Sequence, residues 1–153
     1  MNYKHTQISY PMIIITLVMM AFFIYAYITA SMEPPSYNSG PNFAITSIMI
    51  LVIFILVSFT SLTSSIDKKY LRIKFGYGIY HKKFLLNDIV SAKTVKNHRY
   101  YGWGIKIWLW PKMWIYNISG FDAVEIKLKN NKIYRIGTDE AKKLEQAILT
   151  VIK

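Results

Sequence analysis

The sequence predicts a membrane α-helical hairpin followed by a β-rich domain, in which about seven antiparallel strands form a sandwich or barrel capped by one C-terminal α-helix. Three observations support this fold class. Two long apolar runs open the chain, short segments of alternating apolar and polar residues fill its middle, and a helical apolar stripe closes it. Residues 1–65 are therefore assigned to the hairpin and residues 66–153 to a separate domain.

The two apolar runs are residues 12–30 and 43–62, and neither contains a charged residue. Each has about the 20 residues that a helix needs to cross roughly 30 Å of hydrocarbon. A cleaved signal peptide is the alternative for the first run, but that run exceeds the usual apolar length of about 7–15 residues. Because neither run holds an ionisable residue, we expect both to act as anchors and not as a transport path.

The charges around these runs predict which side of the membrane each segment occupies. The connector, residues 31–42, holds one Glu and no Lys or Arg. The basic residues that flank the runs on the other side are Lys4, Lys68, Lys69, Arg72 and Lys74. Positive charge close to a span favours the cytoplasmic side. We therefore expect a multi-pass protein of the cell (cytoplasmic) membrane, with both termini in the cytoplasm and the connector outside.

Beyond the second run the apolar residues recur with a period of two, which is typical of strands. Glycine, asparagine and proline interrupt the pattern at intervals, as turns do. The strands are expected at residues 70–75, 79–85, 89–95, 104–109, 115–118, 123–129 and 132–136. Asn130 and Asn131 predict a two-residue type I′ hairpin turn, because asparagine tolerates positive φ.

The C-terminal residues change to a helical period. Thr138 is a candidate N-cap, and Asp139 and Glu140 place negative charge at the positive end of the helix dipole. One apolar stripe follows, made of Ala141, Leu144, Ile148, Val151 and Ile152. We expect this stripe to lie on the open end of a strongly curved sheet.

Strands followed by one C-terminal helix are the order of the pleckstrin-homology (PH) superfold. The motifs YGWGI (101–105), WIYNISG (114–120), AVEI (123–126) and IGTD (136–139) resemble those of small bacterial membrane proteins with a PH-like domain behind two transmembrane helices. The resemblance implies a fold and a membrane setting. Many eukaryotic PH domains carry a basic residue, then basic-x-Arg, on their first two strands; Lys74 and Lys82 fit, but Phe84 stands in place of the Arg. General attraction to anionic lipid survives that loss.

The residue inventory argues against an enzyme and a metal protein. The chain has no cysteine, so thiolate metal sites and thiol nucleophiles are excluded. His5, His81 and His98 are widely spaced and lack carboxylates at ligand spacing. GYGIYH at residues 76–81 begins like a dinucleotide fingerprint, but it joins two expected strands and is interpreted as a hairpin turn. We expect no catalytic residue, no metal and no cofactor.

The domain holds 18 Lys or Arg against 7 Asp or Glu, which accounts for the net charge of +11. The candidate lipid- or partner-facing residues are Lys68, Lys69, Lys74, Lys82, Lys83, Lys96, Arg99, Trp103, Lys106 and Lys112. A solvated surface that only satisfies the positive-inside rule is the alternative interpretation of this charge.

All four tryptophans lie within residues 103–114, interleaved with Lys106 and Lys112. Three interpretations stay open: core packing, chiefly for Trp103 and Trp114, an interfacial belt at headgroup depth, and base stacking on single-stranded nucleic acid. The last is disfavoured, because the anchor holds the domain against a lipid surface.

Together these features predict a membrane-anchored, non-enzymatic binding or scaffolding module with a PH-like domain at the cytoplasmic face. Its expected partners are membrane lipids, anionic ones included, and a second copy of the chain. The alternative is an adaptor or regulatory subunit that docks an acidic protein in a membrane complex. An enzyme is a distant third hypothesis, and nucleic acid is not an expected partner.

Overall fold

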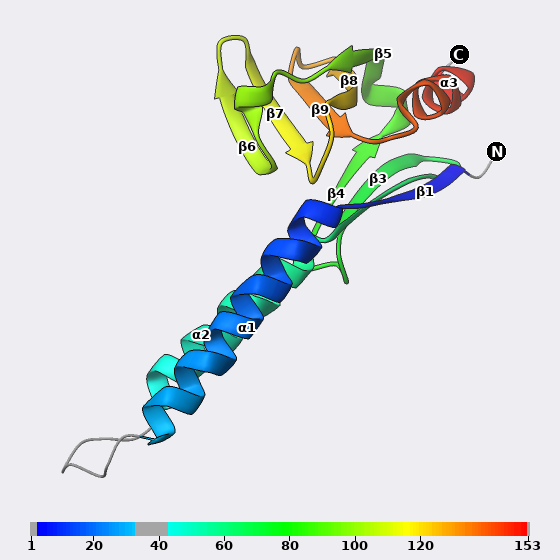
Figure 1. Cartoon of the computed structure of the whole chain (residues 1–153). Helices are drawn as coiled ribbons and strands as arrows, with labels where there is room; N and C mark the ends of the chain where they lie inside the picture. Colours follow the sequence, from blue (N-terminus) through cyan, green and yellow to red (C-terminus); the bar gives the residue numbers. More distant parts are fainter. Residues whose placement is uncertain (1–2, 33–42, 153) are drawn as a thin grey trace.

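The computed structural model describes residues 3–32 and 43–152, and shows a long helical hairpin with a β-rich domain at one end of it (Figure 1). The hairpin consists of α1 (Tyr10–Met32) and α2 (Phe43–Ser58). α1 has 23 residues and is long and apolar enough to cross a membrane, whereas α2 has 16. Most of the predicted external connector, residues 33–42, lies outside the described residues.

The helical hairpin is inserted between two neighbouring strands of the β-rich domain. β1 (Tyr3–Ile8) precedes α1, β2 (Ser61–Ile66) follows α2, and the two strands pair antiparallel along their whole length. The sequence predicts a domain boundary after residue 65. β1 and nearly all of β2 come before this boundary, in the part assigned to the hairpin, although both strands belong to the β-rich domain. The domain and the hairpin are interleaved in sequence.

The second apolar run is not helical over its whole length, although the sequence predicts a helix up to residue 62. α2 ends at Ser58, whose hydroxyl donates to the Ile55 carbonyl at 2.6 Å, and the Thr60 hydroxyl donates to the Val57 carbonyl at 2.8 Å. From Ser61 onward every second residue is buried. This period of two is typical of a strand that pairs with neighbours on both sides. The residues from Ser61 onward therefore form a strand and do not continue the helix.

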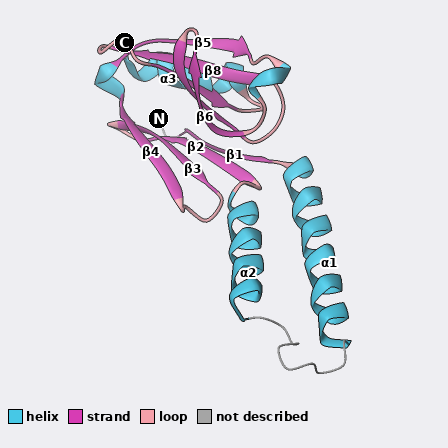
Figure 2. Cartoon of the chain, turned by 90° about the vertical axis from the view of Figure 1, so that its left-hand side faces the viewer, coloured by secondary structure: helices cyan, strands magenta, loops and turns pink. Residues whose placement is uncertain are grey.

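Two sheets make up the domain (Figure 2). The first is antiparallel, with the order β1-β2-β3-β4, and its last two strands are β3 (Tyr70–Phe75) and β4 (Tyr80–Leu85). The second sheet has the order β5-β8-β9-β7-β6. Its strands are β5 (Ile89–Lys96), β6 (Gly104–Leu109), β7 (Lys112–Asn117), β8 (Asp122–Leu128) and β9 (Ile133–Gly137). Short 3-10 turns follow β4 and β5 at Leu86–Asp88 and Arg99–Tyr101, and α3 (Ala141–Ile152) closes the chain.

The predicted β-rich region and C-terminal helix are confirmed, but the strand arrangement differs in detail. The described residues form nine strands and not about seven, because β1 and β2 add to the seven expected. β7 and β9 run parallel, with Met113 opposite Ile133, although all pairs were expected to be antiparallel. The β8–β9 turn is not type I′ either. That turn needs positive φ at both central residues, and among the described non-glycine residues only Asn131 has it, at 60°.

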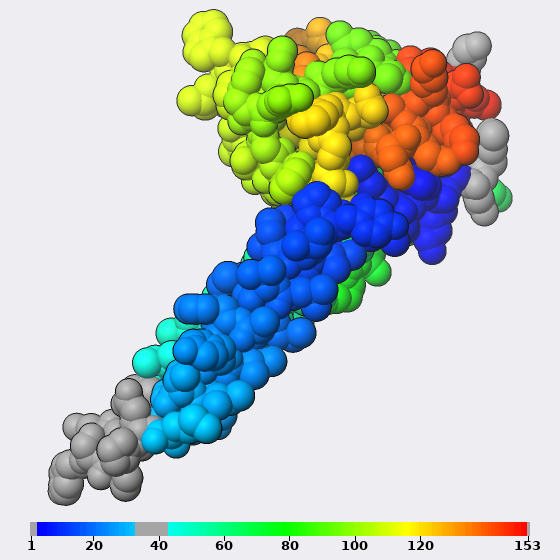
Figure 3. Space-filling view, in the orientation of Figure 1, coloured from blue at the N-terminus to red at the C-terminus, as the bar shows by residue number. Residues whose placement is uncertain are grey.

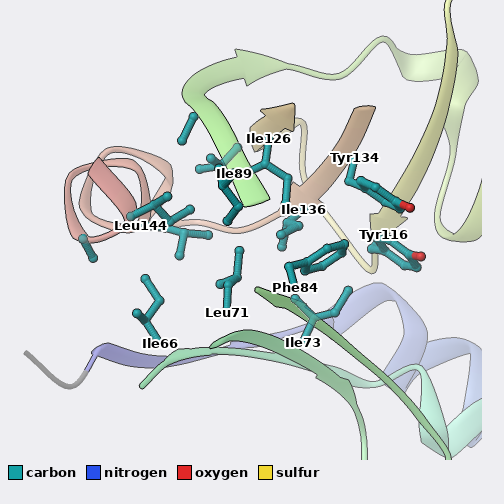
Figure 4. Close-up of a cluster of buried hydrophobic side chains, with 14 of the residues drawn as sticks. Ile66, Leu71, Ile73, Phe84, Ile89, Tyr116, Ile126, Tyr134, Ile136 and Leu144 are labelled. Atoms are coloured by element: carbon teal, nitrogen blue, oxygen red, sulfur yellow. The ribbon is translucent and has the colours of Figure 1, made fainter. Parts of the chain in front are cut away.

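The main core lies between the two sheets and α3 (Figure 4). Leu71, Ile73 and Phe84 enter it from the first sheet, and Ile126 and Ile136 from the second.

α3 contributes the stripe that its sequence predicts. Ala141, Leu144 and Ile148 are buried, and Val151 and Ile152 pack against the core half-buried. The predicted start of this helix is wrong: α3 begins at Ala141, so Thr138 is not its N-cap, and Asp139 and Glu140 precede its first turn. The Thr138 hydroxyl accepts a hydrogen bond from the Glu140 N–H at 3.2 Å in the turn that leads into α3.

β1 is held at both of its ends by the second half of the chain. Near its start, the His5 ring lies between two carboxylates in the turn just before α3, with Nε2 2.5 Å from Asp139 and Nδ1 3.3 Å from Glu140. At its end, the buried Ser9 hydroxyl donates to the Ile118 carbonyl at 2.8 Å and accepts from the Met12 N–H at 3.3 Å. β1 therefore passes into α1 through Ser9, which is hydrogen-bonded to the residue that follows β7.

Candidate functional site

The outer face of the first sheet carries a group of basic and hydroxyl side chains. Alternation along β3 buries Leu71, Ile73 and Phe75 and leaves Arg72 and Lys74 exposed on the opposite face. The other three strands alternate in the same way, so their polar residues join this face.

The strand register arranges these residues in two rows across the sheet. In the first row the consecutive cross-strand partners are Lys4, Ser65, Arg72 and Lys83. In the second row they are Thr6, Thr63, Lys74 and His81. Both rows line one hollow of about 360 Å³. Cationic side chains beside neutral hydroxyl donors are suited to an anion such as a phosphate group.

The hollow is positively charged because lysine and arginine side chains line it and, among the described residues, no acidic side chain does. At its rim, the Asp67 carboxylate lies 2.6 Å from the Arg72 guanidinium. The backbone N–H groups of Lys69 and Tyr70, and then the nearby cations, lower the pKa of Asp67, so this acid stays ionised and offsets the charge of Arg72.

Three lysines in the two rows keep their full charge available to a ligand. Within the described residues, Lys4, Lys74 and Lys83 take part in no ion pair. The outer face of the first sheet therefore presents unpaired positive charge to a ligand or a surface beside it.

One end of this basic face touches the helical hairpin. In the β3–β4 turn, the Tyr77 hydroxyl donates to the Phe54 carbonyl of α2 at 2.5 Å, and the two ring centroids are 5.1 Å apart. A Cβ atom on Gly76 would stand 2.6 Å from the Ser58 carbonyl oxygen, so the turn is packed against the end of α2. Lys74 lies only two residues, or about 7 Å, farther along β3. The second row is therefore the part of the face nearest to α2.

The structure brings together three of the residues predicted to face lipid or a partner. Lys74, Lys82 and Lys83 all line the hollow, although Lys82 shares the strand parity of the inward-facing Phe84. Lys68 and Lys69 lie in the β2–β3 turn, at the end of the sheet opposite to the β3–β4 turn.

The remaining predicted residues lie elsewhere. Arg99 and Trp103 line a separate hollow of about 400 Å³ beside the second sheet, and Lys96 lines an adjoining one. Lys106 lies on β6 and Lys112 begins β7. The predicted residues are thus divided among several surfaces and do not form one.

The four tryptophans also have different environments. Trp114 packs half-buried against the main core, and Trp108 packs against a second small cluster on the second sheet. Trp103 is 39% exposed and Trp110 is 89% exposed. The core interpretation therefore applies to Trp114 and not to Trp103.

The site prediction from sequence omitted the partners of Lys74 and Lys83 in the two rows. These are Lys4, Thr6, Thr63, Ser65, Arg72 and His81. Lys4 and Thr6 were missed because residues 1–65 were assigned to the hairpin and not to the β-rich domain. The available signal was the alternation of residues 61–66, whose buried positions are Leu62, Ser64 and Ile66. A strand there needs a neighbour, and the polar residues before the first apolar run supply it.

Two tyrosine hydroxyl groups lie close together inside the domain. The Tyr80 and Tyr116 hydroxyls are 3.2 Å apart in the core, and burial raises the pKa of Tyr116, so that phenol stays protonated. Within residues 3–32 and 43–152, no group of three or more His, Cys, Asp or Glu side chains could hold a metal ion.

No family model matches the chain, and no curated protein matches it in sequence.

Proposed function

We propose that this protein is a membrane-anchored, non-enzymatic binding module with a PH-like domain, and that the basic outer face of its first sheet contacts anionic lipid headgroups at the cytoplasmic surface. The observation that carries the proposal is the place of that face. Two rows of basic and hydroxyl side chains lie beside the turn that packs on α2. A face so close to an apolar helix meets the headgroups of the membrane in which that helix sits.

The topology of the chain supports a hairpin that crosses the membrane twice. The chain enters α1 from β1 and leaves α2 into β2, and these strands are paired neighbours in one sheet. Both ends of the hairpin are therefore on the same side. If α1 crosses the bilayer, the chain has to return before Ser61, and α2 is the apolar helix in that segment. Its 16 residues span about 24 Å, a shortfall that local thinning of the bilayer accommodates.

The distribution of charge supports a cytoplasmic domain. Lys4, Lys68, Lys69, Arg72 and Lys74 all belong to the domain end of the hairpin, whereas residues 33–42 contain no Lys or Arg. The positive-inside rule assigns the basic side to the cytoplasm. A cysteine at Ser39 should then react with an impermeant thiol reagent on intact cells, and a cysteine at Ser65 should not; the reverse labelling contradicts the orientation.

The order of the elements supports the PH-like assignment. A four-stranded antiparallel sheet comes first, a second sheet follows, and the C-terminal helix packs on the core between them. In this proposal the helical hairpin is an insertion between the first two strands, and the parallel β7–β9 pair is a variation in the second sheet.

The magnitude of the attraction fits a role in orientation and ligand selection. Each basic residue near anionic lipid contributes about 1 kcal/mol, so Lys4, Lys74 and Lys83 contribute about 3 kcal/mol together. This is enough to favour one orientation of the domain by about a hundredfold. It also enriches anionic lipid beside the sheet.

The test compares two pairs of charge reversals in the full chain. The face variant is Lys74→Glu with Lys83→Glu, and the matched control is Lys127→Glu with Lys129→Glu, two exposed lysines of the second sheet and its β8–β9 turn. Each protein is reconstituted in nanodiscs with equal amounts of phosphatidylcholine and phosphatidylglycerol, and the lipids that it retains on release are measured by native mass spectrometry.

We expect the wild type and the control to retain phosphatidylglycerol preferentially, and the face variant to lose this preference. An equal preference in all three proteins contradicts lipid contact through this face. If the face variant instead loses an acidic protein that co-purifies from native membranes, while its lipids stay the same, the adaptor hypothesis replaces the proposal.

A further inference from the structure

A hollow with exposed aromatic walls lies where the second sheet meets the helical hairpin. It is the hollow of about 400 Å³ that Arg99 and Trp103 line, and Phe121 lines it from the β7–β8 turn. We call it the aromatic hollow. Trp103 is 39% exposed and Phe121 is 46% exposed. Neither side chain packs into the two core clusters of the described residues, so packing within the domain does not account for them.

Both walls of the aromatic hollow are fixed in place. On one wall, the Asn97 N–H at the end of β5 donates to the Phe121 carbonyl at 2.6 Å. On the other wall, Tyr101 is 5% exposed and packs into the small cluster on the second sheet, which holds the 3-10 turn Arg99–Tyr101 there. The exposed side chains of the hollow are therefore carried by backbone that is tied to the domain.

Arg99 gives the hollow a cation that is available to an anion. Its guanidinium carbon lies 5.9 Å from the centre of the Phe121 ring. Within the described residues Arg99 forms no ion pair, although Asp122 lines the adjoining hollow together with it. A guanidinium group presents its N–H donors in a planar fork that matches a phosphate. The hollow thus combines a phosphate-binding group with aromatic walls.

The β7–β8 turn connects the aromatic hollow to the start of α1. The Ser9 hydroxyl donates to the Ile118 carbonyl at 2.8 Å, and α1 begins at the next residue, Tyr10. Phe121 belongs to the same turn as Ile118. Figures 1 and 3 show the end of β7 and this turn, in yellow, beside the blue start of α1.

Trp103 lies at the same level as this turn. It directly precedes β6, whose first residue, Gly104, is opposite Asn117 at the end of β7. Neighbouring strands are about 5 Å apart, so Trp103 lies within roughly 10 Å of the turn. α1 has 23 residues and is about 35 Å long, which exceeds the roughly 30 Å of hydrocarbon in a bilayer. The domain end of α1 therefore reaches the headgroup layer, and the aromatic hollow lies beside it.

We propose that the aromatic hollow binds the headgroup of a phospholipid of the cytoplasmic leaflet, with the lipid phosphate on Arg99 and the glycerol backbone against Trp103 and Phe121. The inference rests on the proposed membrane anchoring through α1 and adds a second lipid contact to the one at the first sheet. Indole rings favour the boundary between headgroups and hydrocarbon. Neutral and anionic phospholipids both carry a phosphate, so this site, unlike the basic face, does not select anionic lipid.

The two lipid contacts lie beside different helices of the hairpin. The β3–β4 turn at the basic face packs on α2 through Tyr77, whereas the aromatic hollow adjoins the start of α1 through Ile118. Lipid bound at both places restrains the tilt of the domain on two sides of the hairpin.

Photo-crosslinking in the full chain tests the site. The protein is reconstituted in nanodiscs of phosphatidylcholine that contain a phosphatidylcholine analogue with a diazirine on its headgroup, and cross-linked residues are located by peptide mass spectrometry. We expect cross-links in residues 98–103 and 118–121. Residues 89–91 of β5, at the opposite edge of the second sheet, are the control surface, because Val90 is 58% exposed there and should not be labelled above background.

Matched substitutions test the role of each group. Arg99→Gln removes the charge and should lower the cross-links in the hollow about tenfold, whereas Lys127→Gln, at an exposed position of β8, should leave them unchanged. Arg99→Lys keeps the charge and should retain more of them than Arg99→Gln. Phe121→Ser should also lower them, and Val90→Ser should not. Near-UV circular dichroism shows whether each variant keeps its fold. Equal labelling in Arg99→Gln and Lys127→Gln contradicts the phosphate contact.

A second analogue, with the diazirine in its acyl chain, separates this inference from the proposed function. If this analogue labels α1 and α2 but the headgroup analogue does not label the hollow, the inference is wrong and the anchoring stands. If neither analogue labels the chain, the anchoring fails and the inference fails with it. The Lys74→Glu and Lys83→Glu variant should keep the cross-links in the hollow, and their loss contradicts a separate site.

Inorganic phosphate is the competing ligand for Arg99. It is added at millimolar concentration and compared with chloride at equal ionic strength. The cross-links in the hollow should survive both salts. If phosphate alone removes them while the hairpin stays labelled, the hollow binds free phosphate and the lipid inference is overturned.

Discussion

Replacing Gly76 with alanine should loosen the contact between the domain and the helical hairpin. Gly76 has a φ of +48°, and an added Cβ would stand 2.6 Å from the Ser58 oxygen and 2.8 Å from its Cα. The left-handed conformation costs an alanine about 1–2 kcal/mol, and the clash with fixed backbone adds about 1–3 kcal/mol. The sum of about 2–5 kcal/mol corresponds to a fall in Tm of roughly 5–15 °C for a chain of this size.

Gly120→Ala is the matched control, because it keeps the backbone strain and removes the clash. Gly120 has a φ of +68°, and an added Cβ would meet only the end of the Gln7 side chain, at 3.8 Å. Thermal unfolding in detergent, followed by circular dichroism, should show a loss of about 1–2 kcal/mol for the control and a clearly larger one for Gly76→Ala. Equal losses refute the view that the β3–β4 turn is packed against the end of α2.

Three further predictions concern the stability of the domain. Burial, and then Glu140 and Asp139, raise the pKa of Tyr3 from 10.0 to about 12; the stability this gives is complete below pH 10 and is lost as pH rises through 12, so Tyr3→Phe should flatten that alkaline loss in pH-dependent urea unfolding. Leu144 is fully buried, so Leu144→Ala should cost about 2–5 kcal/mol, whereas Gln146→Ala on the exposed side of α3 should cost little in the same assay. A fragment of residues 66–153 lacks β1 and almost all of β2, and with them the buried Leu62; it should show no cooperative thermal transition, and a sharp transition equal to that of the full chain contradicts the role assigned to these strands.

Local patterns in the sequence predicted the second half of the chain well. The strands at residues 70–75 and 104–109 are observed with the predicted bounds. The buried stripe of α3 is also as predicted. β3 and α3 have one face in a core and the other in water, which is the condition under which periodicity reports structure.

The first half was harder to predict because its signals overlap. Ser61–Ile66 directly continues an apolar run, so the change from a helical to a strand period is hidden in a stretch without charge. β1 is polar and is separated from its partner β2 by the whole hairpin. No local pattern reports a pairing over that distance. For this reason the four residues that β1 and β2 contribute to the two rows, Lys4, Thr6, Thr63 and Ser65, were not predicted.

The pairing order of the second sheet was also beyond local reasoning. The parallel contact of β7 with β9 depends on how the β8 hairpin folds back, and the alternation within each strand is the same for either direction. The exposure of Trp110 follows from its place at the tip of a projecting hairpin. Aromatic composition alone could not separate it from Trp114.

The most direct test of the central claim is the distance between the first sheet and the lipid headgroups. A fluorophore on Ser65→Cys, in the middle of the basic face, is compared in the full chain with one on Ser91→Cys, an exposed residue of β5. Nanodiscs carry lipids with a quencher on the headgroup and either neutral or anionic bulk lipid. We predict strong quenching at position 65 in anionic nanodiscs, weaker quenching in neutral ones or at high salt, and little at position 91. Equal quenching at the two positions, or quenching at position 65 that ignores lipid charge and salt, would contradict the account.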